Sequence, residues 1–355
     1  MTIILPGLTA ALALIFALAL FDQWLERRRG FQLVWAVGLV FFAVASGSEM
    51  LGALLGWSDF LYRTWYLTGA VFTAAWLGLG TALLLNRTRF GYAYGALVFV
   101  GGLLSFAARN RYPDAGDAGL LVFIAAVVVG LAVAVETYFQ NDRWPSIAAI
   151  GVVIASVGAA LAAFSLPLVG GTFTLNPQTG IPTPDAAPGA ERLISLVLNF
   201  SGGLALVLGA MFSAYVFMPK RRVLDYSLDA NQDGDSFLFN LFIAPVAIAA
   251  NFAASLPGAF HALVTGHIHS RVPATLLIGI GGLIASSTDA LARLGSTDLF
   301  QLGKFVGVVL IFAGFLVSIE AFSEIRIPFT GRTLRGQRHE RAASAAGVTA
   351  ASRTD

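Results

Sequence analysis

Residues 3–29 read IILPGLTAALALIFALALFDQWLERRR. The first part, residues 3–21, carries no charge, and three arginines follow at 27–29. A bilayer core about 30 Å thick needs about 20 apolar residues in a helix, so this stretch predicts a membrane span. No basic residue precedes the apolar run, and the arginines follow it. We therefore expect an uncleaved anchor whose N-terminus lies on the outer side of the membrane.

The same pattern recurs along the chain. Of 355 residues, 57% are hydrophobic and 12% are charged, and the mean hydropathy is +0.77. A soluble domain carries about 25% charged residues, so this composition excludes a soluble enzyme, a nucleic-acid-binding protein and a disordered chain. The absence of cysteine excludes disulfides, iron–sulfur clusters and a cysteine nucleophile. Nine spans are predicted, at 3–21, 31–55, 61–85, 90–108, 119–139, 147–168, 193–218, 272–291 and 302–322.

Residues 237–270 decide the predicted topology. The segment contains no Asp, Glu, Lys or Arg, but it carries Pro245, Pro257, Asn240 and Asn251. If it does not cross the membrane, 16 of the 22 Lys and Arg residues lie inside and 6 outside; if it crosses, they divide 11 and 11. Basic residues favour the inner side, so we predict nine spans with the N-terminus out and the C-terminus in. The prolines and asparagines indicate a broken, re-entrant or interfacial helical segment.

The predicted fold class is therefore an all-α, polytopic membrane helix bundle in two blocks. The first block, residues 1–218, holds seven spans. After it we expect a polar cytoplasmic linker at 219–236, the re-entrant or interfacial segment at 237–270, two further spans at 271–325 and a basic, disordered cytoplasmic tail at 326–355. No internal repeat of the kind found in many transporters is evident.

Residues 1–220 contain a distinctive set of aromatic and glycine motifs. These are Gly56-Trp57, Tyr62-Arg63, Trp65-Tyr66-Leu67, Gly69-Ala70 and Trp76-Leu77-Gly78-Leu79-Gly80-Thr81, with Asn199, Gly203, Gly209-Ala210 and Ser213 in the seventh span. The set resembles a group of uncharacterised seven-helix membrane proteins of bacteria, actinobacteria especially. The resemblance implies seven helices and a bacterial cytoplasmic membrane, and it implies no activity.

Ionisable groups inside a membrane are costly and therefore mark candidate sites. Glu49, Arg63, Asp289 and Lys304 fall near the outer ends of predicted spans, and the midplane is nearly empty of charge. Glu49 and Arg63 flank one short hairpin, so we expect them to pair. Lys304 is expected to reach Asp289 or to extend to the interface. Together the four form a tentative substrate site, and the alternative is that they are interfacial or structural charges. The charge-poor midplane favours an uncharged or lipid-like cargo over an ion.

The longest outer loop spans residues 169–191. Residues 171–175 alternate like a strand, and residues 176–180, Asn-Pro-Gln-Thr-Gly, are typical of a turn. Long loops are often solvated connectors, and we expect one here. The alternative is a small hairpin over the outer end of the bundle, where it would close a pocket above Glu49, Arg63 and Lys304.

Two motifs carry residues that bind metals elsewhere. Residues 229–235, DANQDGD, match the first half of an EF-hand loop, but the twelfth position is Asn240 instead of glutamate, which favours a simple turn. His261, His267 and His269 are close in sequence but have no carboxylate or cysteine beside them, so they are weak metal candidates. We expect no bound metal and no cofactor.

Two functional hypotheses follow. In the first, the protein binds or transports a weakly polar or lipid-like solute in an outward-facing cavity. In the second, it is a non-catalytic structural subunit of a larger membrane complex; this is suggested by pairs of small residues at Gly52/Gly56, Gly91/Gly95 and Gly303/Gly307. No set of residues suggests an enzyme. Expected partners are membrane lipids, with further copies of the chain or other membrane subunits left open, and no nucleic acid.

Overall fold

The computed structural model describes residues 3–139, 142–177, 179–227, 237–265, 269, 271–293 and 300–317, without the side chains of 237–239, 241–242, 286 and 288–293. Helices make up almost all of this part. They are α1 (Ile4–Arg27), α2 (Gly30–Leu55), α3 (Asp59–Tyr66), the π-helix η1 (Leu67–Thr73), α4 (Ala74–Leu84), α5 (Phe90–Ala108), α6 (Ala118–Tyr138), α7 (Trp144–Ser165), α8 (Gly189–Phe217), α9 (Phe237–Val264), α10 (Arg271–Arg293) and α11 (Phe300–Val317).

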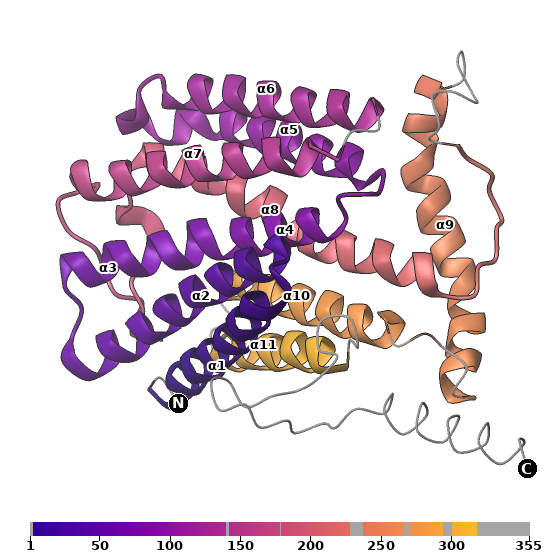
Figure 1. Cartoon of the computed structure of the whole chain (residues 1–355). Coiled ribbons are helices and arrows are strands. Elements are labelled where there is room, and N and C mark those ends of the chain that lie inside the picture. Colours follow the sequence, from indigo (N-terminus) through magenta and orange to yellow (C-terminus); the bar gives the residue numbers. More distant parts are fainter. Residues whose placement is uncertain are drawn as a thin grey trace, which may run out of the picture.

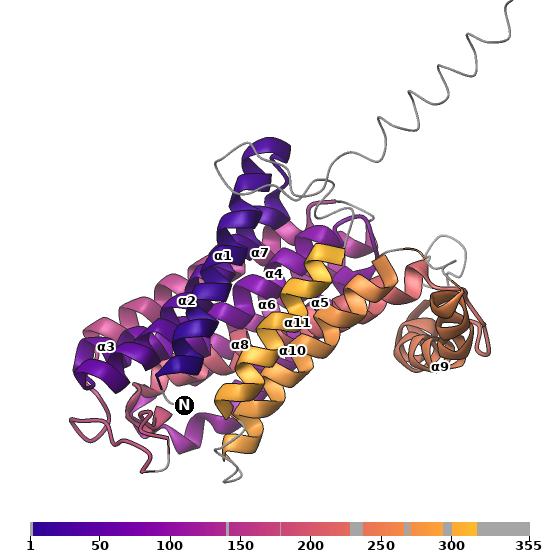
Figure 2. The same cartoon turned by 90° about the horizontal axis from the view of Figure 1, so that it is seen from below.

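All of the long helices except α9 run along one common direction, and α9 lies across one end of them (Figures 1 and 2). Helices α3, η1 and α4 follow one another as a single rod. Along the chain, the direction reverses at each connection, as expected for successive spans joined by short loops. The arginine-rich turn at Arg27, the α4–α5 connection and the α6–α7 connection all lie at the end that α9 crosses.

Nine helical segments of the described chain are long and apolar enough to cross a membrane, so this is a multi-pass helical membrane protein. Length and hydropathy alone include Ile243–Val264 of α9 and leave out α10, whose apolar part is the shorter Arg271–Ala285. The packing groups α10 with the lengthwise helices instead of α9, because α10 lies lengthwise against α8 and α11. With α10 counted and α9 set aside, the lengthwise rods correspond in order to the nine predicted spans, and which helices cross the membrane stays a prediction.

The predicted break in residues 237–270 is wrong. Helix α9 continues through both Pro245 and Pro257. Each proline removes one backbone hydrogen bond. The remaining backbone N–H and C=O groups in an apolar environment can form hydrogen bonds only within the helix, so the helix continues. Asn251 does not break the helix either, because its side chain binds a neighbouring segment, as described below.

Helix α8 is the centre of the bundle and packs against α4, α5, α7 and α10. Its crossing with α4 is a contact of backbones: a Cβ atom on Gly78 would lie 2.3 Å from the carbonyl oxygen of Gly202. Helices α10 and α11 cross in the same way, since a Cβ atom on Gly281 would lie 2.6 Å from the carbonyl oxygen of Gly307. Glycine is required at such close approaches, and these glycines serve contacts within the chain.

The last two helices share a core with the first two. Phe16 and Trp35 pack against Phe315, with ring centroids 4.8 Å and 4.7 Å apart. Ile311 of α11 and Ile278 of α10 belong to the same buried cluster. Helices α10 and α11 are thus packed into the bundle formed by the first seven rods.

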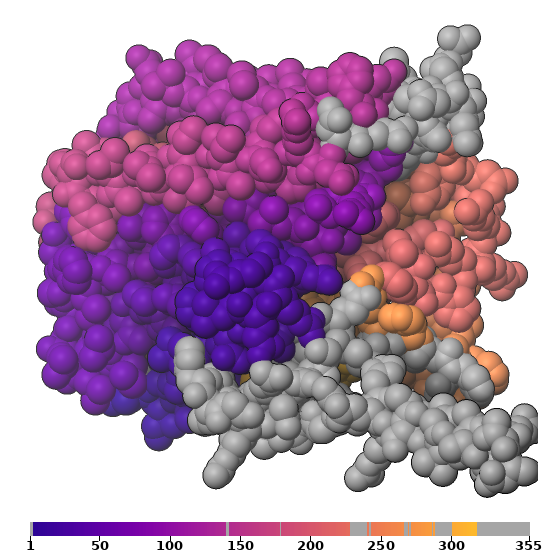
Figure 3. Space-filling view, in the orientation of Figure 1, coloured from indigo at the N-terminus to yellow at the C-terminus, as the bar shows by residue number. Residues whose placement is uncertain are grey.

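Helices α6 and α7 form one outer face of the bundle (Figure 3). Their exposed side chains are apolar, among them Leu121, Val128, Leu131, Ile150, Ile154 and Leu161. Such a surface is stable in lipid and not in water. The Asp-rich residues 229–235 and the tail at 326–355 lie outside the described residues.

Candidate functional site

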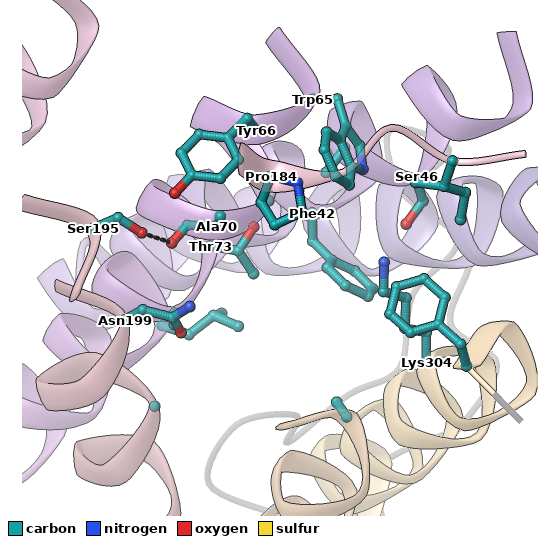
Figure 4. A pocket seen from close by; sticks show the side chains of 18 of the residues that line it. Phe42, Ser46, Trp65, Tyr66, Ala70, Thr73, Pro184, Ser195, Asn199 and Lys304 are labelled. Carbon is teal, nitrogen blue, oxygen red and sulfur yellow. Dashed lines mark hydrogen bonds between the residues drawn. The ribbon is translucent and has the colours of Figure 1, made fainter. Parts of the chain in front are cut away.

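A cavity of about 600 Å³ lies inside the bundle. Helices α2, η1 and α4 form one wall, and α8, α10 and α11 form the other, with residues of the 176–185 loop at one end (Figure 4). The polar groups around it include Ser46, Thr73, Arg192, Ser195, Asn199 and Lys304. The lining residues of α8 extend from Arg192 to Leu206, which corresponds to about 20 Å along the helix.

The loop at this end of the cavity forms the small hairpin and not the expected solvated connector. Leu175 and Pro182 form an antiparallel bridge, and the Thr183 amide donates to the Thr174 carbonyl over 2.8 Å. Gly180, with φ of 66°, closes the turn. Glycine adopts this left-handed conformation without strain, which is why a turn is expected here.

Two side chains fasten the hairpin to the bundle. Trp57 Nε1 donates to the Gly180 carbonyl over 3.0 Å, and the Tyr62 hydroxyl donates to the Thr183 carbonyl over 3.3 Å. Both side chains belong to the α2–α3 hairpin. The loop at 176–185 is therefore held as a cover over the cavity.

Glu49 on α2 is a buried carboxylate beside the cavity, with 2% of its surface exposed. Lys304 Nζ lies 2.7 Å from Glu49 Oε1, and Trp65 Nε1 donates to the same oxygen over 2.9 Å. Gln301 Nε2 donates to Glu49 Oε2 over 2.8 Å. Lys304 Nζ also lies 4.0 Å from the ring centroid of Phe300. Three elements, α2, α3 and α11, thus meet at one carboxylate whose charge is compensated.

Arg63 does not join this cluster, so the predicted Glu49–Arg63 pair is wrong. Its Nε lies 2.9 Å from Asp59 Oδ2, and its Nη1 donates to the carbonyls of Ala163 and Leu166. Those carbonyls are at the C-terminus of α7, where the helix has unpaired acceptors and a partial negative charge. Arg63 therefore caps α7 and does not line the cavity.

The π-helix η1 supplies Gly69, Ala70 and Thr73 to the cavity wall. A π-helix is wider than an α-helix and often occurs at functional sites. Ser195 Oγ of α8 donates to the Ala70 carbonyl over 2.7 Å, which joins η1 to the opposite wall (Figure 4). Thr73 Oγ1 donates to the Thr68 carbonyl over 2.8 Å, so its hydroxyl is already paired.

Helix α8 presents Asn199 and Gly203 to the cavity. The Asn199 amide has no hydrogen-bond partner among the described residues, and Figure 4 shows it across the cavity from Lys304. A Cβ atom built on Gly203 would meet nothing within 4 Å. Asn199 is thus a polar group available to a ligand, and Gly203 leaves space that a side chain would fill.

The cavity becomes less polar away from the hairpin. At the covered end Arg192 pairs with Asp185 over 3.2 Å and lies 4.4 Å above the ring of Tyr112. The far end is lined by Leu39, Leu77, Leu206, Val308 and Ile311. Such a gradient suits a molecule with one polar end and one apolar end.

A second hollow of about 360 Å³ adjoins the first along α8. The two share Tyr66, Pro184, Arg192, Ser195, Asn199 and Gly203. The second one continues past Phe200 and Leu204 to Leu283 of α10, which is half exposed. The cavity therefore extends sideways toward the cleft between α8 and α10, on an apolar surface.

The remaining predicted site residues lie elsewhere or are not described. Asp289 lies in α10, and its side chain is outside the described residues. His261 is exposed on α9, and His269 stacks on Phe217 with ring centroids 5.0 Å apart; His267 is not described. Among the described side chains no three His, Asp or Glu lie close enough together to hold a metal ion.

Two partners of Glu49 are absent from the predicted site. Trp65 enters the sequence analysis only as part of the motif Trp65-Tyr66-Leu67, although its place 16 residues from Glu49, across one short hairpin, is a usable signal. Gln301 gives no signal except its place one turn before Lys304. The prediction also omits Glu191, a second carboxylate with 1% of its surface exposed, whose Oε1 has no hydrogen-bond partner among the described residues.

No family model, no characterised protein and no solved structure matches the chain. The resemblance of residues 1–220 to seven-helix bacterial membrane proteins stays a prediction. The function therefore has to be inferred from the cavity.

Proposed function

We propose that the protein binds a lipid-like solute in this cavity and exchanges it with the outer part of the membrane. The observation that carries the proposal is the pairing of a polar, covered end with an apolar far end in one 600 Å³ space. That volume lies in the range of small-molecule binding sites. With the N-terminus outside, as the distribution of basic residues favours, the hairpin faces outward.

The charges of the cavity support an uncharged polar head group. Lys304 and Arg192 are its cations, and both already have carboxylate partners, Glu49 and Asp185. A ligand carboxylate or phosphate would have to compete with these pairs. The free amide of Asn199 and the hydroxyl of Ser46 suit a neutral hydroxyl or ester group instead.

The sideways extension between α8 and α10 supports entry from the membrane. A solute dissolved in lipid would reach the cavity past Leu204 and Leu283 without entering water. The alternative role, a structural subunit of a larger complex, is weakened because Gly95, Gly202, Gly281 and Gly307 already pack against helices of the same chain. The cytoplasmic membrane is the proposed location, because the resemblance of residues 1–220 to bacterial membrane proteins implies it.

The proposal can be tested by photolabelling the purified protein in lipid nanodiscs with a diazirine-bearing monoacylglycerol. Gly203→Leu should lower cavity labelling roughly tenfold or more, because the new side chain fills the space and meets no neighbour. Gly258→Leu is the matched control, since Gly258 also has nothing within 4 Å of its Cβ position but lies on α9. Equal labelling of both variants would overturn the proposal.

A further inference from the structure

A second feature of the molecule lies away from the cavity, at the end of the bundle that α9 crosses. The segment after α8 runs along α9 (Figures 1 and 2). Helix α9 is attached to the bundle by Ala259, which packs in one cluster with Ala214, Tyr215, Met218 and Val272. The helix therefore lies crosswise and touches the bundle through a small apolar contact.

Buried polar side chains of α9 hold the segment that follows α8. Asn251 Oδ1 accepts from the amides of Val223 and Leu224 over 2.7 and 3.0 Å, and Asn251 Nδ2 donates to the Leu224 carbonyl over 2.7 Å. Ser255 Oγ accepts from the Arg221 amide over 2.8 Å. Asn251 and Ser255 are 0% and 1% exposed, so these bonds are shielded from water.

This clamp fixes the backbone of a basic triplet, Lys220-Arg221-Arg222, whose side chains are all exposed. None of the three forms an ion pair within the described part of the chain. Lys220 lies above the ring of Tyr215, with Nζ 5.7 Å from the centroid. Asp225 is the nearest acidic residue along the described segment. Two guanidinium groups are thus displayed at a fixed place beside α9.

Apart from His261, the exposed side chains of α9 that the structure describes are apolar. Phe260 and Val264 are 68% and 71% exposed, and Val246, Leu256 and Leu263 are also exposed. The sequence from 237 to 270 contains no Asp, Glu, Lys or Arg. Because α9 lies across the spans and its exposed side chains are mostly apolar, lipid acyl chains can cover it while the neighbouring arginines stay at the level of the head groups.

From this arrangement we propose that α9 and the 220–222 triplet form a binding surface for anionic phospholipid head groups in the leaflet on the arginine-rich side. The acyl chains would cover Phe260, Leu263 and Val264, and the phosphate would be bound by Arg221 and Arg222. Guanidinium groups bind phosphate oxygens in pairs, which favours arginine at such a site. Charge complementarity and the apolar helix select the same ligand, an anionic lipid, over an acidic protein.

The test measures lipid binding by native mass spectrometry of the full chain, titrated with phosphatidylglycerol or with phosphatidylcholine. Wild type should prefer phosphatidylglycerol. Arg221→Gln/Arg222→Gln should lose roughly thirtyfold in affinity for it, at about fivefold for each basic residue at an anionic surface. Arg87→Gln/Arg143→Gln is the matched control, because these exposed arginines lie at the same end of the bundle but away from the clamp; it should retain the preference.

Three outcomes would overturn the proposal. The first is an unchanged phosphatidylglycerol preference in the Arg221/Arg222 variant, and the second is an equal loss in the Arg87/Arg143 control. The third is full displacement of the lipid by inorganic phosphate, which would indicate a free-anion site. As a further check, Asn251→Leu removes the clamp but no charge and should also weaken the preference, whereas a loss of binding with unchanged selectivity would contradict a role in positioning.

Discussion

The ammonium nitrogen of Lys304 lies 2.7 Å from the Oε1 atom of Glu49, although 255 residues separate the two in the chain. The contact joins α11 to α2 beside the cavity, where Trp65 and Gln301 supply the other hydrogen bonds of the carboxylate. A buried pair of this kind is costly to break from one side, because the remaining charge keeps its desolvation penalty without its partner.

Lys304→Met should therefore destabilise the protein by about 3–5 kcal/mol, because it leaves the Glu49 carboxylate buried without a counter-charge. Adding Glu49→Gln should restore part of the loss, since a neutral amide still accepts from Trp65. Unfolding can be followed through the intrinsic fluorescence of the six tryptophans. Arg87→Gln/Asp142→Asn serves as the control, because that pair spans 3.9 Å with both side chains largely exposed and should contribute little. Strictly additive effects at Glu49 and Lys304 would contradict the pairing.

Arg63→Met should lower stability by about 1–3 kcal/mol, because the α7 carbonyls of Ala163 and Leu166 lose a charged donor. Binding of the monoacylglycerol probe should remain unchanged in the fraction that stays folded, since Arg63 does not line the cavity. The comparison of melting temperature with photolabelling separates the two effects. A selective loss of labelling at unchanged melting temperature would place Arg63 in the binding site instead.

The difference at Arg63 illustrates what hydropathy and spacing can predict. Composition located the spans, and the asparagine at 176 and the glycine at 180 located the turn of the hairpin, because both depend on local sequence. Which helix lies beside Glu49 depends on how distant helices pack, through contacts such as Gly78 with Gly202 and Phe16 with Phe315. Those contacts bring α11 beside α2, and no local pattern around Glu49 indicates it.

In helix α9, local sequence predicts a break that contacts with a distant segment prevent. Pro245 and Pro257 indicate a helix break in any local reading, because proline removes a backbone donor. Asn251 likewise has a low helix propensity. The structure retains the helix because Asn251 gains three hydrogen bonds to the segment at 223–224, and that partner lies 27 and 28 residues earlier in the chain. The π-helix at Leu67–Thr73 likewise has no local sequence signal.

Ser195→Ala should destabilise the protein by about 1–3 kcal/mol and weaken probe binding, because it removes the donor that joins α8 to η1 at the Ala70 carbonyl. Ser201→Ala is the matched control. Ser201 is also a buried serine of α8, but it donates to the Val197 carbonyl of its own helix, so its loss affects no second element. The measurements are the melting temperature and the photolabelling yield of each variant. Equal effects at both positions would mean that the contact with η1 has no special role.

The hairpin cover leads to a kinetic prediction. Trp57→Phe removes the hydrogen bond to the Gly180 carbonyl, and Tyr62→Phe removes the one to the Thr183 carbonyl. Each bond is worth about 0.5–1.5 kcal/mol. If the cover has to lift for the solute to leave on that side, each variant should release the bound probe roughly two- to tenfold faster. Displacement with unlabelled monoacylglycerol measures this rate.

Phe60→Leu is the matched control for these two variants, because Phe60 is an exposed aromatic residue of α3, the helix that also carries Tyr62, but contacts the ring of Phe164 instead of the hairpin. Its release rate should equal that of wild type. Unchanged release in both hairpin variants, at unchanged affinity, would show that the solute leaves through the cleft between α8 and α10 alone. Exit past the hairpin therefore predicts faster probe release in the Trp57 and Tyr62 variants, whereas exit between α8 and α10 predicts an unchanged release rate.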